Sequence, residues 1–144
     1  MFASLNNGFS RLSDHPDLAK LLLRLTFGIL MLFHGAFKMQ HGVGWIGGML
    51  AQHGLPAFIA YGAYIGEIVT PLMIIIGFMT RPAALIYAVN LVVATLLVHT
   101  ADVFTRTQVG AWKLETEALY FMGGIVIMLL GAGRYVLVSN PRLQ

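Results

Sequence analysis

Four apolar stretches, each long enough to cross a lipid bilayer as a helix, limit this chain to few architectures. A helix needs about 20 apolar residues to span the hydrocarbon core, and residues 18–37, 56–79, 82–99 and 112–131 provide such stretches. Only 10% of the residues are charged, whereas a soluble domain usually carries about 25%. Because this deficit extends along the whole chain, we expect an all-α integral membrane four-helix bundle.

Helix-boundary signals support these spans. Pro16 precedes the first span and Pro56 opens the second, and proline suits a first helical turn. The sequence TRP at 80–82 leaves room only for a tight turn before the third span. The glycines of GAGR at 131–134 suit the end of the fourth helix. The chain is too short for more than one domain, so we expect a single membrane domain over residues 1–144.

The distribution of Lys and Arg predicts the orientation, because cytoplasmic loops carry an excess of these residues. With both termini cytoplasmic, the inner side holds Arg11, Lys20, Arg24, Arg81, Arg134 and Arg142, and the outer side holds Lys38, Arg106 and Lys113. We therefore expect a multi-pass protein of a bacterial-type inner membrane with both termini in the cytoplasm. Arg24, near the inner end of its span, is expected to extend its side chain to the cytoplasmic surface.

The first outer loop, QHGVGWIGGMLAQHGLP at residues 40–56, contains a helical pattern. Trp45 and Ile46 recur with Met49 and Leu50 at helical spacing, which predicts a short interfacial helix over the mouth of the bundle. The alternative is that this loop, like the second outer loop, is a plain connector.

Polar side chains are unevenly distributed with depth. Glu67 lies eleven residues into its span, roughly 16 Å from the outer end at 1.5 Å per residue, and Asn90 reaches a similar level. The polar groups predicted in the outer half or near the midplane are His34, Lys38, Glu67, Asn90, His99, Glu115 and Glu117. The inner half contains almost none beyond Arg24, so we expect a polar pocket that opens outward.

Glu67 is the strongest candidate for a functional role. An ionised carboxylate at mid-bilayer costs several kcal/mol on insertion scales, so Glu67 must be protonated, paired or beside water. It is either a proton-relay or ligand-binding carboxyl, or a structural lock that is hydrogen-bonded to Asn90 or to a histidine. Pro71, one turn further along, should kink the helix and free a carbonyl near this carboxyl.

Each of the other polar residues has two interpretations. His34 is a site residue or an interfacial anchor, and His99 is a site residue or an interfacial polar group. Asn90 orients Glu67 or joins two helices. Lys38 is a surface anchor, or it pairs with a carboxylate of the fourth span.

Glu115 and Glu117 point about 200° apart on a helix, so they are not expected to share a face. Periodicity favours Glu117 as the inward residue, although both occupy a first turn that favours carboxylates in any case. Tyr64 and Trp112 belong to an aromatic group at the outer level. They form an interfacial belt or bind a flat ring between them.

The composition excludes several classes of site. The chain has no cysteine, so it cannot form a disulfide, a thiolate zinc site or an iron–sulfur cluster. No closely spaced histidine pair predicts a metal site, and no haem or flavin motif is present. The net charge of +3 is small and scattered, which does not indicate nucleic-acid binding.

The order of the motifs resembles the DoxX family of small four-helix membrane proteins. The resemblance runs over residues 18–138, through LLLRLTFGILMLFHGAFKM, GEIVTPLMIIIGFMTRPAAL, NLVVATLLVH, GAWKLETEALYF and LLGAGRYVL. Its most telling residues are Arg24, the His34-Gly35 pair, Lys38, Glu67, the Thr80-Arg81 turn, Asn90, His99 and the closing Gly-Ala-Gly-Arg. Spacing back from Gly131 matches Glu115 to the family's acidic residue, against the periodicity.

The resemblance implies a quinone-linked or redox-associated role, since relatives are linked to quinol oxidase and thiosulfate:quinone oxidoreduction. We expect at most a component of a membrane oxidoreductase system, with Glu67 and His34 as the central residues and a quinone as a candidate ligand. Asn90, His99, Lys38, Glu115, Glu117, Trp112 and Tyr64 are the candidate ligand-binding residues. Partners would be the bilayer, a redox partner protein and further copies of the chain. A non-catalytic scaffold or assembly subunit is the alternative, and a small proton-coupled transporter is a third.

Overall fold

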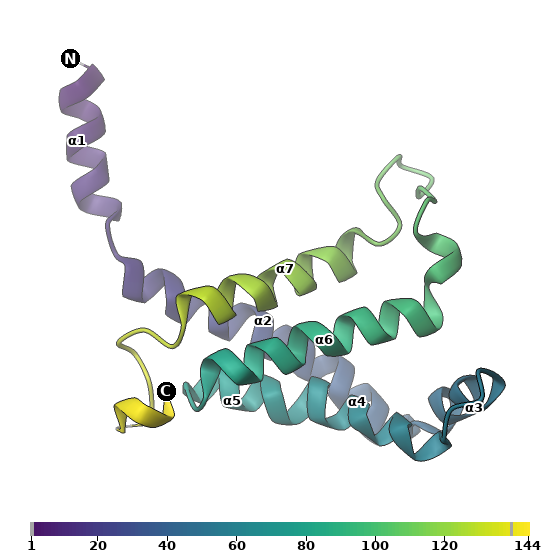
Figure 1. Ribbon diagram of the computed structural model, residues 1–144. Coiled ribbons are helices and arrows are strands. Elements are labelled where there is room, and N and C mark those ends of the chain that lie inside the picture. The colour runs from purple at the N-terminus through teal and green to yellow at the C-terminus, as the bar shows by residue number, and fades with distance from the viewer. Residues whose placement is uncertain (1, 139) are drawn as a thin grey trace.

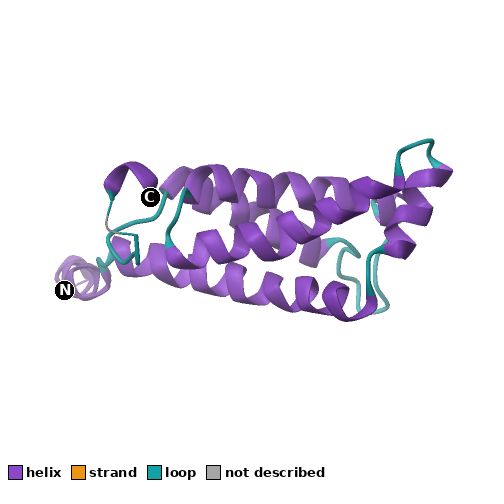
Figure 2. Ribbon diagram, turned by 90° about the horizontal axis from the view of Figure 1, so that it is seen from below, coloured by secondary structure: helices purple, strands orange, loops and turns teal. Residues whose placement is uncertain are grey.

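The protein folds mainly as four helical rods that pack side by side (Figures 1 and 2). The structure, a computed structural model, describes residues 2–138 and 140–144. Three rods are α2 (Pro16–His41), α6 (Thr80–Val98) and α7 (Glu115–Leu130). The remaining rod is continuous in space but segmented, and it runs through η1 (Ala57–Tyr61), α4 (Gly62–Tyr64), η2 (Ile65–Val69) and α5 (Thr70–Ile76). α5 packs on α2 and α6, and α7 packs on the same two helices, so the rods close into a ring.

The prediction of an all-α membrane fold is confirmed. In the part of the chain that is described, no strand occurs beyond one isolated bridge between Arg106 and Trp112. Three described helical segments are long and apolar enough to cross a membrane, namely Pro16–His41, Ala57–Ile76 and Thr80–Val98. α7 has 16 residues, about 24 Å of helix, so it is shorter than the predicted stretch at 112–131. Residues 112–114 lie in the loop before it.

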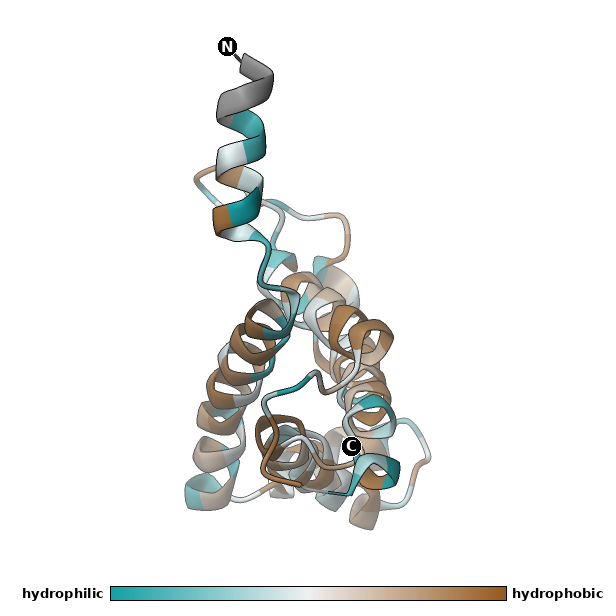
Figure 3. Ribbon diagram, turned by 90° about the vertical axis from the view of Figure 1, so that its left-hand side faces the viewer, coloured by the Kyte–Doolittle hydropathy of each residue, from teal (hydrophilic) through white to brown (hydrophobic). Residues whose placement is uncertain are grey.

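The two ends of the bundle differ. One end, called here the terminal end, carries the turn between α5 and α6, η4 (Pro141–Leu143) and α1 (Phe2–Ser13), which stands away from the bundle and transverse to it (Figures 1 and 3). The opposite end, called the loop end, carries α3 (Gly44–Gln52), η3 (Thr100–Asp102) and the segment that leads to α7. The short helix predicted in the first loop is therefore present as α3.

α3 is held to the loop end by its apolar face. Ile46 and Leu50 are 9% and 3% exposed, and they form a cluster with Val43 and Ala60. Trp45, one residue before Ile46, remains half-exposed. The helical spacing in the sequence thus reflects burial against η1, and the helix covers one side of the bundle mouth.

The segmented rod changes its helical geometry at Glu67. Residues Ile65–Val69 form one turn of π-helix, and Pro71 is the second residue of the α-helix that follows. Proline has no N–H group, so the Glu67 carbonyl lacks the donor that an α-helix would supply four residues later. α2 approaches this carbonyl closely, because a Cβ atom on Gly35 would lie 2.5 Å from the Glu67 carbonyl oxygen. A residue larger than glycine at position 35 would push α2 away from Glu67.

Arg24 is buried, and the prediction that its side chain reaches the cytoplasmic surface is wrong. It is 1% exposed. Its Nε atom donates to the Ile74 carbonyl at 2.7 Å, and Nη2 donates to the Ile75 carbonyl at 2.8 Å. Nη1 donates to the carbonyls of Ala132 and Tyr135 at 2.6 and 2.8 Å. The last carbonyls of a helix lack intrahelical donors and carry partial negative charge, so they can hold a guanidinium inside the protein.

Arg81 also donates hydrogen bonds to the last carbonyls of a helix, in this case α7. From the start of α6, its Nη1 atom donates to the carbonyls of Met128 and Leu129, both at 2.9 Å, in the last turn of α7. Arg24 on α2 thus caps α5, and Arg81 on α6 caps α7. Together the two arginines connect all four rods at the terminal end.

We predict that Arg24→Met lowers the free energy of unfolding by about 3 kcal/mol or more, because it leaves buried carbonyls without donors. This corresponds to a fall of roughly 10 °C in the unfolding midpoint. Size-exclusion chromatography of heated, detergent-solubilised protein measures the midpoint. The exposed Arg134 provides the control variant Arg134→Met, which should change it little. A wild-type midpoint for Arg24→Met would contradict the capping role.

Candidate functional site

The centre of the candidate site is an ion pair between Lys38 and Glu67. Lys38 Nζ donates to Glu67 Oε1, and their side chains are only 15% and 5% exposed. Lys38 belongs to the last turns of α2, because this helix continues to His41, beyond the predicted end at residue 37. The bond therefore joins α2 to the π-helical turn. It neutralises the carboxylate at a depth where an unpaired charge would be costly.

This geometry changes the interpretation of Lys38. The side chain is neither a surface anchor nor paired with the fourth span, as the sequence suggested, but is paired with Glu67. Tyr64 fixes the same region from the neighbouring rod, since its hydroxyl donates to the Lys38 carbonyl at 3.1 Å. Tyr64 thus supports the backbone that carries Lys38.

Asn90 lies beside Glu67 but makes no hydrogen bond with it in the described structure. Its side chain packs against the backbone of η2, where a Cβ atom on Gly66 would lie 2.3 Å from Asn90 Cγ. Asn90 Nδ2 and Glu67 Oε2 are both buried without a hydrogen-bond partner. A free donor and a free acceptor therefore stand near each other, and buried polar atoms of this kind usually have partners.

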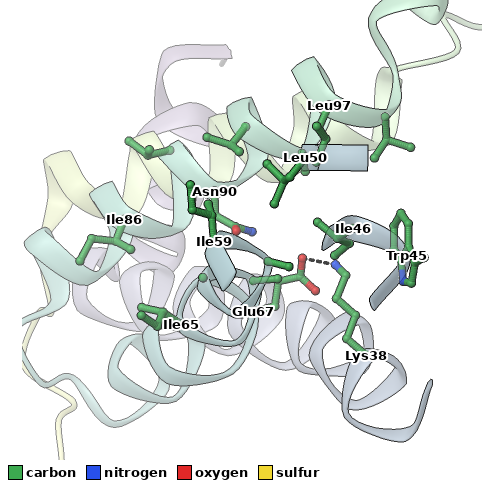
Figure 4. A pocket seen from close by; sticks show the side chains of 18 residues that line it. Lys38, Trp45, Ile46, Leu50, Ile59, Ile65, Glu67, Ile86, Asn90 and Leu97 are labelled. Carbon is green, nitrogen blue, oxygen red and sulfur yellow. Dashed lines mark hydrogen bonds and ion pairs between the residues drawn. The ribbon is translucent and has the colours of Figure 1, made fainter. Parts of the chain in front are cut away.

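Asn90 and Glu67 both line a hollow of about 330 Å³, called here the apolar hollow (Figure 4). Lys38, Glu67 and Asn90 are its charged or amide side chains. Its apolar lining comes from α3, η1, η2 and α6, and includes Trp45, Ile46, Leu50, Ile59, Ile65, Ile86, Val89, Val93 and Leu97. Ile65, Ile86 and Val89 are about half-exposed on the outer surface of the bundle. In a bilayer this surface faces lipid, so the hollow opens towards the hydrocarbon.

A second hollow of about 160 Å³, called here the polar hollow, also borders the ion pair. It shares Lys38, Trp45 and Glu67 with the apolar hollow. The further titratable side chains in its lining are His34, His99, Glu117 and Tyr120. The rings of His34 and Tyr120 meet edge to face, with centroids 5.7 Å apart.

The polar hollow ends in a chain of charged groups at the loop end. His99 Nε2 lies 3.8 Å from Glu117 Oε1, and His99 Nδ1 lies 3.2 Å from Asp102 Oδ2. Lys113 Nζ donates to Asp102 Oδ1 at 2.5 Å. The hydrogen bond from Lys113, followed by that with His99, holds the pKa of the Asp102 carboxyl below its usual range. Asp102 therefore stays ionised at neutral pH and fixes the position of His99.

The structure brings most of the predicted site residues together. His34, Lys38, Glu67, His99 and Glu117 all line the polar hollow, and Asn90 lines the apolar hollow. Of the two acidic residues of α7, Glu117 is the inward one, while Glu115 is exposed and lines neither hollow. The inward position of Glu117 agrees with the periodicity, while the match of Glu115 to the family's acidic residue stays a prediction.

Two predicted aromatic residues lie outside both hollows. Tyr64 contacts the backbone of α2 as described above. Trp112 is in the loop before α7, and its Nε1 atom donates to the Val103 carbonyl at 2.7 Å. It lines a separate surface hollow with Glu117 and apolar residues of α6 and α7. Neither residue is part of the lining of the apolar hollow.

Sequence reasoning missed Asp102 and Trp45 as parts of the site. Asp102 follows His99 by three residues, a spacing that lets two side chains meet at a helix end. Trp45 was predicted only as part of the short helix over the bundle mouth and was not named among the candidate ligand-binding residues. Within the described ranges, no three His, Asp or Glu side chains form a group that could hold a metal ion.

The fold and site define a class of protein, namely a helical membrane protein with a buried ion pair between an apolar and a polar hollow. The model of the DoxX family matches residues 19–100, more than half of the chain, so this protein belongs to the DoxX family. A relative from Bacillus subtilis (strain 168), named "Putative oxidoreductase CatD", is 32% identical over 82 residues. The match covers 57% of this chain and 60% of the relative, which is less than two thirds of its length. No solved structure matches the chain.

We predict that Lys38→Met is strongly destabilising, by about 3–5 kcal/mol, because it leaves a buried carboxylate without its cation. The double variant Lys38→Met/Glu67→Leu removes both charges and should recover most of this loss. Thermal unfolding of the single and double variants in one detergent measures the coupling free energy. Additive losses in the double variant would contradict a buried, mutually dependent pair.

Proposed function

We propose that this DoxX-family protein binds a quinone-type, bilayer-soluble ligand and serves as the membrane component of a redox system. The observation that carries the proposal is that Lys38, Glu67 and Asn90 line the apolar hollow, while Asn90 Nδ2 and Glu67 Oε2 have no hydrogen-bond partner. Ligand sites are typically apolar cavities with a few converging polar groups, and this hollow has that composition.

The ligand class follows from the polar groups and from the direction in which the hollow opens. A quinone presents carbonyl oxygens, which need donors, and Asn90 and Lys38 can supply them. A quinol presents hydroxyl groups, which also need an acceptor, and Glu67 Oε2 can accept. Because the half-exposed rim residues Ile65 and Ile86 face lipid, the ligand would enter from the bilayer with its apolar tail towards the rim.

In this proposal Glu67 holds or passes the proton of the bound headgroup, and the Lys38 ammonium pairs with its other oxygen. Asn90 orients the headgroup rather than Glu67. His34 and His99, expected from the sequence to contact ligand oxygens, line the polar hollow instead. Their proposed role is therefore on the proton side of Glu67.

The membrane arrangement is part of the proposal. α7 completes four spans in a single membrane domain, and the terminal end faces the cytoplasm of a bacterial-type inner membrane. The excess of basic residues at the terminal end, six against three at the loop end, supports this orientation. The apolar hollow then lies in the outer half of the bilayer.

Electrons would be exchanged with a partner protein, since the sequence contains no haem or flavin motif and no cysteine. The similarity to a relative with oxidoreductase in its name supports a redox association. The second candidate is a scaffold or assembly subunit. The Lys38–Glu67 pair and the Arg24 bonds favour it, because both join helices of the bundle.

Quenching of tryptophan fluorescence by a decyl-chain benzoquinone tests ligand binding. The chain has two tryptophans, and Trp112→Phe leaves only Trp45, which lines the apolar hollow. In this background we predict saturable quenching. Asn90→Ala should weaken the affinity about threefold to tenfold, as expected for one hydrogen bond.

The control variant is Asn7→Ala, which changes an exposed asparagine outside the bundle and should leave the affinity unchanged. Quenching that rises linearly with quinone in the membrane, and equally in all variants, would show partitioning without a site. In that case the scaffold alternative would be preferred.

A further inference from the structure

We infer that the polar hollow is a proton path that connects Glu67 with the water at the loop end, through Glu117 and the His99–Asp102 pair. This inference deepens the proposed function, since a quinone that accepts electrons from a partner protein also takes up one proton per electron. The proton that reaches the headgroup at Glu67 would leave the water at the loop end and pass along this path. The reverse direction would serve quinol oxidation.

Glu67 is the inner end of the proposed path. This carboxyl is 4% exposed, lines both hollows and has one oxygen without a partner. On the apolar side its polar neighbours are Lys38 and Asn90, neither of which readily passes a proton onward. On the polar side the lining contains imidazole, carboxyl and phenol groups. Only the polar side therefore offers Glu67 a series of groups that can exchange protons.

The groups that face the polar hollow come from every rod around it. α2 provides His34 and Lys38, the segmented rod provides Glu67, and α7 provides Glu117 and Tyr120. His99 follows the last turn of α6. The hollow of about 160 Å³ has room for several water molecules, which can bridge these groups.

Glu117, His99 and Asp102 form the outer end of the path, at the loop end. Glu117 has one buried oxygen without a partner, and its other oxygen lies 3.8 Å from His99. His99 is half-exposed and contacts Asp102 on its other ring nitrogen. An imidazole between two carboxylates can take a proton on one nitrogen and release one from the other. Lys113, about half-exposed, holds the outermost carboxylate in place.

The other end of the polar hollow is closed. Met31 and Leu91, at its deep end, are 3% and 9% exposed and belong to the apolar core. The same core includes Ile74 and Ile127, both almost fully buried, on the way to the terminal end. Beyond them the Arg24 guanidinium donates to four carbonyls. The path thus connects Glu67 with one side of the membrane only.

Kinetics of Trp45 fluorescence test the path without any quinone. In the Trp112→Phe background, Trp45 lines both hollows beside Glu67, so its emission reports the protonation of that carboxyl after a stopped-flow pH jump. Glu67→Gln identifies the relevant phase, which this variant should lack. We expect Glu117→Gln to slow the phase by at least about tenfold, in line with the loss of a proton-transfer group, and His99→Gln to slow it as well.

The matched control is Glu115→Gln, two residues from Glu117 on the same helix but exposed and outside both hollows. It should leave the rate unchanged. Equal rates in Glu117→Gln and Glu115→Gln would overturn the inference. The initial and final fluorescence of the Glu117→Gln, His99→Gln and Glu115→Gln variants should equal those of the Trp112→Phe parent, which shows that the fold is retained.

A second measurement needs no substitution along the path. Dicyclohexylcarbodiimide modifies protonated carboxyl groups from the lipid phase, and mass spectrometry locates the adduct. In proteoliposomes of one orientation, acidifying the loop side should increase labelling of Glu67, and acidifying the terminal side should not. Labelling that follows the pH of the terminal side, or of both sides equally, would overturn the inference. If both tests give the expected results but the protein does not bind quinone, the proton path stands and the proposed ligand is wrong.

Discussion

The cost of an unpaired charge in hydrocarbon is the constraint on which the rest of this structure depends. The chain meets it in two ways. At the terminal end, Arg24 and Arg81 use the free carbonyls at the ends of α5 and α7 as partners, which also joins the four rods. In the other half, Lys38 and Glu67 neutralise each other. In the first solution all three nitrogens of the Arg24 guanidinium donate to carbonyls, whereas the second leaves one carboxylate oxygen without a partner.

Because of this difference, the terminal end of the bundle has a structural role, whereas the other half contains the candidate functional site. Arg24, bonded to four carbonyls, closes the terminal end. Glu67 lines two hollows of different character, one apolar and open towards lipid, the other polar and connected to the loop end. Two local features place Glu67 there: the π-helical turn before Pro71, and Gly35, which lets α2 approach the carbonyl of Glu67. The π-helical turn and the close approach at Gly35 therefore determine both the packing of α2 and the position of the proposed ligand site.

Much of the fold could be predicted from the sequence, because apolar length and helical period carry that information directly. Three membrane-length helices, the short helix α3 and the inward direction of Glu117 all follow from these patterns. Pairings between helices could not be derived in this way. Arg24 was expected to reach the cytoplasmic surface, since sequence does not reveal that the carbonyls of Ile74 and Ala132 converge on it. Lys38 and Glu67 are 29 residues apart, and only the packing of α2 on η2 shows that they meet.

The central claim is that the apolar hollow beside Glu67 and Asn90 holds a lipid-soluble quinone-type ligand. Photocrosslinking in membranes with an azido-benzoquinone, followed by peptide mapping, tests it most directly. Adducts are expected on the residues that line the apolar hollow, such as Ile86 and Val89 of α6. Excess unlabelled quinone should suppress these adducts. Adducts spread over exposed α2 residues such as Leu22 and Phe33, without such suppression, would contradict the claim.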